Sequence, residues 1–186
     1  MAPRRAARRD LEGPLRPAQI AVVGASDQSA ELIGLAEEVG RRLAEAGATV
    51  VCGGLGGVME AVCRGAKGAG GTTVGILPGA DRTAANRFVG IAIPTGLGEA
   101  RNAVVARAGD AMIAVGGGYG TLAEIALARR AGIPVIGLDT WELARGGRAV
   151  DAIARAGSAE EAVELALAAA RGGGAPGRGS RPGEAG

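Results

Sequence analysis

The chain has 186 residues, of which 47% are hydrophobic, so it is long enough to bury one core and we expect a single domain. Its formal net charge is only +2 and it contains no histidine, which excludes every mechanism that uses an imidazole base. The two cysteines, Cys52 and Cys63, are too few for an ordinary zinc site or a disulfide framework. We interpret both as small buried residues and expect no metal site.

The two ends of the chain differ in composition from the middle. Residues 1–17 contain five arginines and two acidic residues, and residues 172–186 are dominated by glycine with proline, arginine and serine. Such segments bury too little apolar area to offset the entropy of ordering, so we expect a disordered Arg-rich arm and a disordered tail around a domain over residues 18–171. The alternative for the arm is nucleic-acid binding, but it lacks aromatic residues and repeats, and we do not expect that partner.

No run of the sequence reaches the length of a transmembrane helix. The N-terminal arm also lacks the apolar core of a signal peptide. We therefore expect a cytoplasmic protein without a membrane partner.

Taken in chain order, six apolar runs alternate with segments whose apolar residues have helical spacing. The runs are 20–23, 49–52, 73–77, 88–93, 111–115 and 134–138. Strands that alternate with helices predict βαβ units, and a core with few aromatic residues is compatible with buried parallel strands. The expected fold class is α/β, a Rossmann-like doubly wound parallel sheet with helices on both faces. After the last run, Ser158 and Glu161 form an S-x-x-E capping box, which predicts a final helix.

Glycine follows most of these runs within one to three residues, and open parallel sheets bind ligands outside the carboxyl ends of their strands. The strongest candidate for a phosphate site is the loop after the run 111–115, where glycines bring backbone N–H groups to the start of a helix and a threonine adds a hydroxyl donor. Its residues are Gly117, Gly118, Tyr119, Gly120 and Thr121. Further binding candidates near neighbouring strand ends are Ser26, Gly53, Gly54, Gly56 and Asn102.

Two known phosphate-binding motifs are alternatives for this loop. A Walker A loop is excluded because Lys67 is the only lysine and the pattern G-x-x-x-x-G-K-[ST] does not occur. The pattern Gly118-x-Gly120-x-x-Ala123 fits a dinucleotide fingerprint, and Asp139 lies where a ribose-binding acid is expected. This pattern follows the fifth run, however, and not the first.

Two charged residues near the glycine loop are candidate catalytic residues. Arg101 follows the sequence T-G-L-G-E-A, and Glu124 lies one turn into the helix after the loop. The ordinary alternatives are a solvated arginine at a helix start and a helix N-terminal acid favoured by the macrodipole. Because Glu124 follows Thr121 by three residues, it either forms a capping box with this threonine or projects toward the phosphate site.

Several motifs occur here in one order. Residues 116–124 read G-G-G-Y-G-T-L-A-E, and further glycine-containing blocks lie at 53–60, 75–79 and 95–98. From Ile20 to Leu138 this pattern resembles the Rossmann-like LONELY GUY superfamily, long labelled lysine decarboxylase-like, with the signature P-G-G-x-G-T-x-x-E. It looks closest to the bacterial branch that is similar to molybdenum cofactor carrier proteins.

The resemblance implies a phosphoribohydrolase that cleaves the N-glycosidic bond of a nucleoside 5′-monophosphate such as AMP. The products would be a free base and ribose 5-phosphate, and no cofactor would be required. Arg101 would hold the nucleotide, and Glu124 would stabilise developing positive charge or orient water. The glycine loop would bind the 5′-phosphate. The related enzymes are dimers, which implies a homodimer or a higher homo-oligomer.

The chain departs from the family pattern at three positions. Gly116 replaces a proline, Asn102 replaces the lysine of an R-K pair, and Glu99 replaces a histidine. The last two changes remove positive charge beside an anionic ligand. The alternative function is therefore a non-enzymatic carrier that binds a molybdopterin-type cofactor, and both interpretations stand at this point.

Overall fold

A computed structural model describes residues 16–26 and 29–172. Within them, seven strands form one sheet in the order β4-β3-β2-β1-β5-β6-β9, and every neighbouring pair is parallel. The strands are β1 (Gln19–Val23), β2 (Thr49–Cys52), β3 (Thr73–Leu77), β4 (Ile91–Pro94), β5 (Ala111–Val115), β6 (Val135–Leu138) and β9 (Ala154–Ala156). The expected α/β class with a parallel sheet is confirmed.

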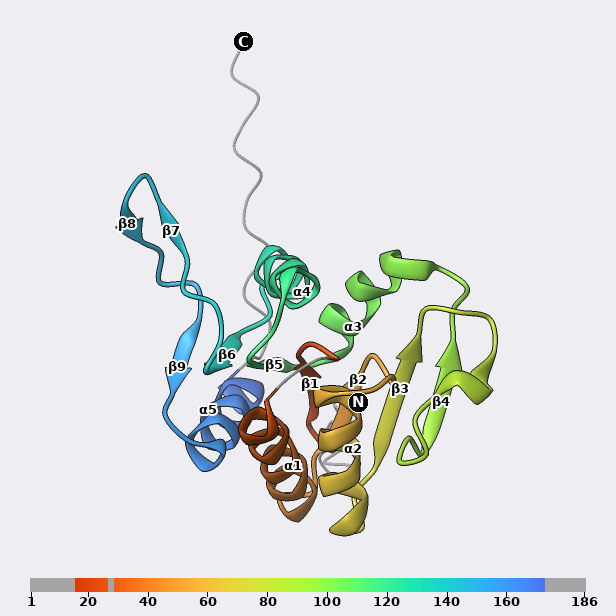
Figure 1. Cartoon of the computed structure of the whole chain (residues 1–186). Coiled ribbons are helices and arrows are strands. Elements are labelled where there is room, and N and C mark those ends of the chain that lie inside the picture. Colours follow the sequence, from red (N-terminus) through yellow and green to blue (C-terminus); the bar gives the residue numbers. More distant parts are fainter. Residues whose placement is uncertain (1–15, 27–28, 173–186) are drawn as a thin grey trace, which may run out of the picture.

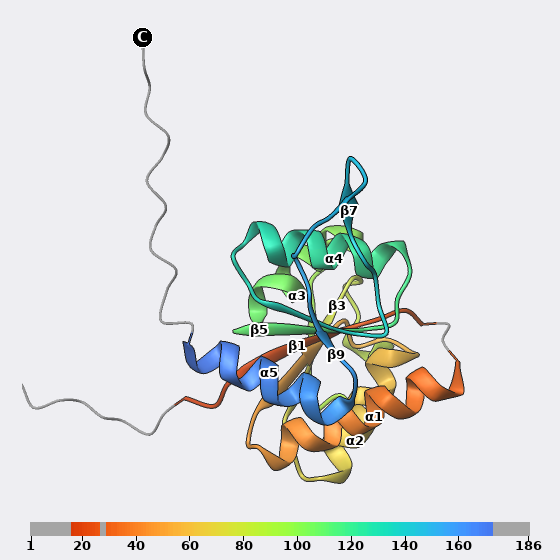
Figure 2. The same ribbon diagram turned by 90° about the vertical axis from the view of Figure 1, so that its left-hand side faces the viewer.

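Helices cover both faces of the sheet, as expected for a doubly wound fold (Figure 1). One face carries α1 (Ala30–Glu45), α2 (Val58–Gly68) and α5 (Ala159–Gly172). The other carries α3 (Asn102–Ala108) and α4 (Tyr119–Arg130). Figure 2 shows these two layers above and below the sheet. Two short 3-10 helices, η1 (Arg82–Ala84) and η2 (Gly98–Arg101), complete the helical elements of the described residues.

The central strands are apolar throughout because each of their faces is buried under helices. In β1, Ile20 and Val22 belong to the core under α1, α2 and α5, whereas Ala21 and Val23 belong to the core under α3 and α4. All five residues of β5 are buried. Strands buried on both sides show continuous apolar runs without alternation, which is why the runs were visible in the sequence. Both cysteines are buried and free, as interpreted.

The helices α1 and α2 approach each other until their backbones touch. A Cβ atom at Gly40 would lie 2.0 Å from the carbonyl oxygen of Val62, and one at Gly65 would lie 1.9 Å from that of Glu37. Only glycine fits at these two crossing points.

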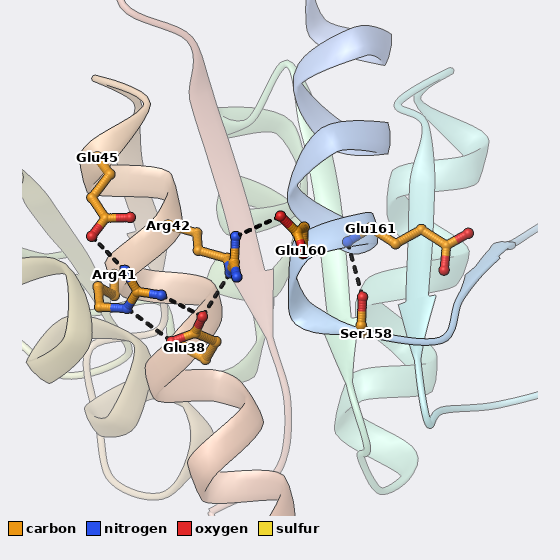
Figure 3. Close-up of polar contacts among 7 residues, drawn as sticks. All are labelled: Glu38, Arg41, Arg42, Glu45, Ser158, Glu160 and Glu161. Atoms are coloured by element: carbon orange, nitrogen blue, oxygen red, sulfur yellow. Dashed lines mark hydrogen bonds and ion pairs between the residues drawn. The ribbon is translucent and has the colours of Figure 1, made fainter.

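An ion-pair network lies on the outside of this layer (Figure 3). Arg42 binds Glu38 in its own helix at 2.6 Å and Glu160 of α5 at 3.1 Å, so it joins α1 to α5. At the start of α5 the Ser158 hydroxyl accepts the Glu161 N–H at 3.2 Å, as the capping box predicts. The Glu161 carboxylate accepts the N–H of Gly157 at 2.8 Å, one residue before the usual partner.

Three parts of the chain differ from the sequence-based expectation, and one of them is the short edge strand β9, which no apolar run predicted. The run 88–93 was expected as one strand, but β4 begins only at Ile91. Phe88 and Val89 pack against the core instead, because the Thr73 hydroxyl donates to the Phe88 carbonyl and accepts from Gly90 N–H.

A small hairpin, β7 (Ala144–Arg145) and β8 (Arg148–Ala149), projects from the body (Figure 1) and was not predicted. Its turn is Gly146-Gly147, with φ of 58° and 75°. Two successive positive φ angles are typical of a type I′ turn, so the Gly-Gly pair was an available signal.

The disorder expected for residues 1–17 and 172–186 falls almost wholly outside the described residues, and Gly172 itself closes α5. Among the residues that are described, no helix is long and apolar enough to cross a membrane.

Candidate functional site

The strand order reverses between β1 and β5, which are neighbours in the sheet although β2, β3 and β4 separate them in sequence. Ligands of open α/β sheets bind in the crevice at such a switch point. A pocket of about 180 Å³ lies there. It is lined by Ser26 from the loop after β1, by Arg101 and Asn102 at the junction of η2 and α3, and by Gly118, Gly120, Thr121 and Glu124 at the start of α4.

The first turn of α4 opens onto this pocket without a side-chain cap. Its N-cap is Gly118, whose position leaves the N–H groups of the first turn without partners inside the helix. Gly117 has φ of +117°, and a Cβ atom there would lie 2.5 Å from that of Thr121, so glycine is required. Unpaired N–H groups at the positive end of a helix form an anion-binding site.

Thr121 lies inside the first turn and is 2% exposed, and its hydroxyl oxygen has no hydrogen-bond partner. The capping-box alternative for Thr121 and Glu124 is therefore wrong, because Gly118 takes the N-cap position and Glu124 turns to an arginine. A buried hydroxyl without a partner is costly in a finished core. Beside the free N–H groups of α4, it is a donor available to a ligand.

Arg101 and Glu124 meet on the floor of the pocket. Arg101 Nη1 lies 3.5 Å from Glu124 Oε1, and the two side chains are 9% and 10% exposed. The burial contradicts the solvated arginine, and the helix N-terminal acid is contradicted because the first turn of α4 contains no acidic residue. Burial raises the pKa of Glu124 to about 7, against the opposing effect of the Arg101 charge. Arg101 Nε is also buried without a partner, so the guanidinium has a donor to spare.

The three glycines expected after β2 do not line the pocket. Gly53 instead leaves room for the Arg101 side chain, because a Cβ atom at residue 53 would lie 2.5 Å from Arg101 Nη1. Its missing side chain is the space that the guanidinium occupies. The Gly54 carbonyl accepts two hydrogen bonds from Asn86, which ties the loop to the chain before β4. Gly56 faces open space.

Two residues that hold the glycine loop from the β6 side were not predicted from the sequence. Trp141 Nε1 donates to the Gly118 carbonyl at 3.2 Å, and the Thr140 hydroxyl donates to that of Gly116. Tyr119 does not line the pocket; its ring centre lies 5.7 Å from that of Trp141. Both missed residues closely follow a strand end, and Trp141 is the only tryptophan.

Metal-binding side chains do not gather here. Within residues 16–26 and 29–172, no three histidine, cysteine or carboxylate side chains form a group that could hold a metal ion.

Comparison with known proteins gives one family and two kinds of relative. A model of the SLOG cluster4 family matches residues 17–169. An uncharacterised protein of Archaeoglobus fulgidus is 42% identical over 149 residues, which are 80% of this chain and 94% of that protein. A probable cytokinin riboside 5′-monophosphate phosphoribohydrolase of rice, Oryza sativa subsp. japonica, is 39% identical over 93 residues, which are 48% of this chain but only 38% of the rice protein.

The similar solved structures include molybdenum cofactor proteins. The molybdenum cofactor binding protein of the bacterium Rippkaea orientalis superposes with a TM-score of 0.75 at 35% identity, over 83% of this chain and 98% of its own. The Moco carrier protein of Chlamydomonas reinhardtii superposes with a TM-score of 0.74 at 33% identity, over 84% of this chain and 99% of its own. The resemblance inferred from the sequence is confirmed, together with its position near the carrier proteins.

Proposed function

The chain belongs to the SLOG cluster4 family, and on this premise we propose that it binds a small phosphorylated ligand at the start of α4. The observation that carries the proposal is the unpartnered hydroxyl of Thr121, buried beside the uncapped N-terminus of α4. A phosphate placed there would accept from the hydroxyl and from the N–H groups of the first turn. Arg101, which lines the same pocket, would add a charged donor.

The leading activity is hydrolysis of the N-glycosidic bond in a nucleoside 5′-monophosphate, with free base and ribose 5-phosphate as products. With its phosphate at the start of α4, a nucleotide would extend its sugar into the pocket, toward Glu124. The ionised carboxylate would stabilise positive charge on the ribosyl carbon or orient the attacking water. A pKa of about 7 leaves a substantial ionised fraction at neutral pH.

The direct test is incubation of the full chain with AMP and with a cytokinin riboside 5′-monophosphate, followed by chromatography of the free base. Glu124→Ala should lower the rate at least about 100-fold, and Thr121→Val should weaken AMP binding about tenfold. Glu164→Gln, at an exposed residue of α5 outside the pocket lining, is the matched control. Absence of free base with the wild type, or a rate unaffected by Glu124→Ala, would reject the enzyme.

The second candidate is a carrier for a molybdopterin-type cofactor, without turnover. It is favoured by Asn102, which lines the pocket where related enzymes place a lysine, and by the similarity to carrier proteins over nearly their whole length. The phosphate of such a cofactor fits the same donors, Thr121 and the N-terminus of α4. The cofactor would supply its own redox chemistry, and the chain would hold it and shield it from water and oxidants.

The carrier is tested by purifying the full chain from cells that make the cofactor and identifying bound pterin by its fluorescence after oxidation. The carrier should retain pterin and slow its oxidation in air, and Thr121→Val should retain less. A preparation without pterin that gives no protection would reject this candidate.

We also propose that the protein acts as a homodimer in the cytoplasm. Ile91 and Ile93 of β4, the strand at the sheet edge, and Leu97 shortly after it are exposed large apolar side chains. An unpaired edge strand that bears apolar residues and no charge is a natural pairing surface. Light scattering should give about twice the monomer mass of 18.2 kDa, and Ile93→Lys should shift it toward one chain. A single-chain mass at every concentration would refute the dimer.

A further inference from the structure

A second pocket lies on the other side of the glycine loop. It has a volume of about 140 Å³ and opens at the carboxyl ends of β6 and β9, where Asp139, Thr140 and Trp141 line it. The pocket with Glu124 lies between β1 and β5, and the glycine loop follows β5. Because the sheet order is β1-β5-β6-β9, the two pockets flank the start of α4.

An aromatic pair stands beside this second pocket. Tyr119 is 83% exposed although it is one of only three aromatic residues in the chain. Its ring lies 5.7 Å from that of Trp141 at an angle of 40°, and Trp141 is held by its hydrogen bond to the Gly118 carbonyl. The exposed ring is thereby fixed next to the anion site, in the arrangement that lets a planar heterocycle stack on it.

Asp139 supplies the polar group of this pocket. It is the one non-glycine residue of the described chain with a positive φ, +49°. Non-glycine residues in this conformation are uncommon and occur most often where asparagine or aspartate serves a turn or a site. Its exposed carboxylate can accept hydrogen bonds from sugar hydroxyl groups or ring N–H groups.

We propose that the ligand has a planar heterocycle at each end of a central diphosphate. This inference rests on the proposed function and extends it: the diphosphate lies at the start of α4, one nucleoside-like half enters the pocket of Glu124, and the other half stacks on Tyr119. Asp139 binds the sugar of this second half. This placement also explains the sequence pattern Gly118-x-Gly120-x-x-Ala123 with Asp139, which fits a dinucleotide-binding fingerprint. The glycines lie at the diphosphate, and Asp139 lies at the sugar.

The test compares AMP with P1,P2-di(adenosine-5′) diphosphate on the full chain, by calorimetry and by the fluorescence of Trp141, the only tryptophan. The two-ringed probe should bind about tenfold more tightly than AMP and should change the Trp141 fluorescence, as expected for one additional stacked base. Tyr119→Ala should remove this tenfold advantage while the Kd of AMP stays within about twofold. Tyr119→Phe keeps a ring and should keep the advantage.

Two results would overturn the proposal: equal affinities of the wild type for the two probes, or a Tyr119→Ala variant that weakens AMP as much as the two-ringed probe. Because Tyr119 is largely exposed, its replacement leaves the core intact. Failure of the proposed function looks different. In that case AMP binding is absent, or it is unchanged in Thr121→Val, whatever the behaviour of Tyr119.

Discussion

Glu124 is the residue whose environment departs most from that of an ordinary surface acid. The carboxyl lies on the floor of a pocket, and its Arg101 partner at 3.5 Å offsets only part of the burial cost, so its pKa rises from 4.5 to about 7. A group of this kind holds its proton more tightly in the folded protein than in the unfolded chain. Between these two pKa values the folded state binds more protons, and stability therefore falls as the pH rises.

The first prediction concerns Glu124→Gln, which keeps the shape and neutral charge of the protonated acid. The variant should match the wild type near pH 4 and exceed its free energy of unfolding at pH 8 by about 1–3 kcal/mol, because one pKa unit corresponds to about 1.4 kcal/mol. Urea unfolding at pH 4, 6 and 8 measures the difference. Glu99→Gln is the control at an exposed acid. If the free energies of unfolding of Glu124→Gln and the wild type changed in parallel with pH, Glu124 would ionise as an ordinary acid.

The second prediction separates two glycines of the same loop. In Gly53→Ala the new Cβ would lie 2.5 Å from Arg101 Nη1 and 2.7 Å from the sulfur of Met59, whereas in Gly56→Ala it would meet nothing within 4 Å. Displacing the guanidinium by a fraction of an ångström should weaken AMP binding about tenfold in Gly53→Ala alone. Calorimetry with AMP gives both constants. Equal affinities in the two variants would mean that Arg101 does not depend on the space at Gly53.

Sequence reasoning at this scale found the members of the site but not their contacts. Arg101 and Glu124 were named from the motif, yet only the fold brings residues 23 positions apart to 3.5 Å. The capping alternative failed because nothing local distinguishes Gly118 from Thr121 as the N-cap. Trp141 was missed because its role is a hydrogen bond to the Gly118 carbonyl, a contact across two loops that no spacing rule encodes.

At the scale of elements, the close contact of α1 and α2 depends on two glycines. A Cβ atom at Gly40 would press on the carbonyl oxygen of Val62, a backbone atom that cannot move without its helix. Gly34 belongs to the same helix but faces open space. Replacement by alanine therefore changes helix propensity equally at the two positions, but it causes a clash at Gly40 and none at Gly34.

The third prediction follows from this contrast. Gly40→Ala should lower the free energy of unfolding by about 1–3 kcal/mol through overpacking, and Gly34→Ala should raise it by about 0.5–1 kcal/mol because alanine favours helix. Both are measured by urea unfolding at neutral pH. A Gly40→Ala protein as stable as Gly34→Ala would show that the helices can separate freely.

Elements were predictable wherever burial on both faces left a continuous apolar run, as in Ala111–Val115. The limit appeared at the sheet edge. There Phe88 and Val89 continue an apolar run without being part of β4, because side-chain hydrogen bonds from Thr73 take the backbone groups that a strand would use. Hydrophobicity alone cannot distinguish a residue of a strand from a loop residue that packs against the core.

At the scale of the whole molecule, two apolar clusters pack on the two faces of one sheet, and the pocket lies at the switch point of that sheet. Every buried apolar residue of the described chain lies between Ile20 and Ala166, on both faces of one sheet. The last contribution comes from α5, which places Ala159, Ala162, Val163 and Ala166 in the larger of the two clusters. The helix is thus part of the folding unit and not an appendage to it.

The fourth prediction tests domain limits close to residues 18–171, which the composition suggests. A chain cut to residues 16–172 should keep its free energy of unfolding within about 0.5 kcal/mol and its affinity for AMP within about twofold, because all of the core and the whole pocket lie inside these limits.

A chain that ends at residue 157 lacks α5, loses its four buried residues and exposes the apolar face of β5 and β6. It should unfold or aggregate, since a small domain has only about 5–15 kcal/mol in all. Urea unfolding and size-exclusion chromatography compare the two. If the 16–172 protein were clearly destabilised, residues outside the core would have to contribute contacts of their own, and the domain limits would need to be extended.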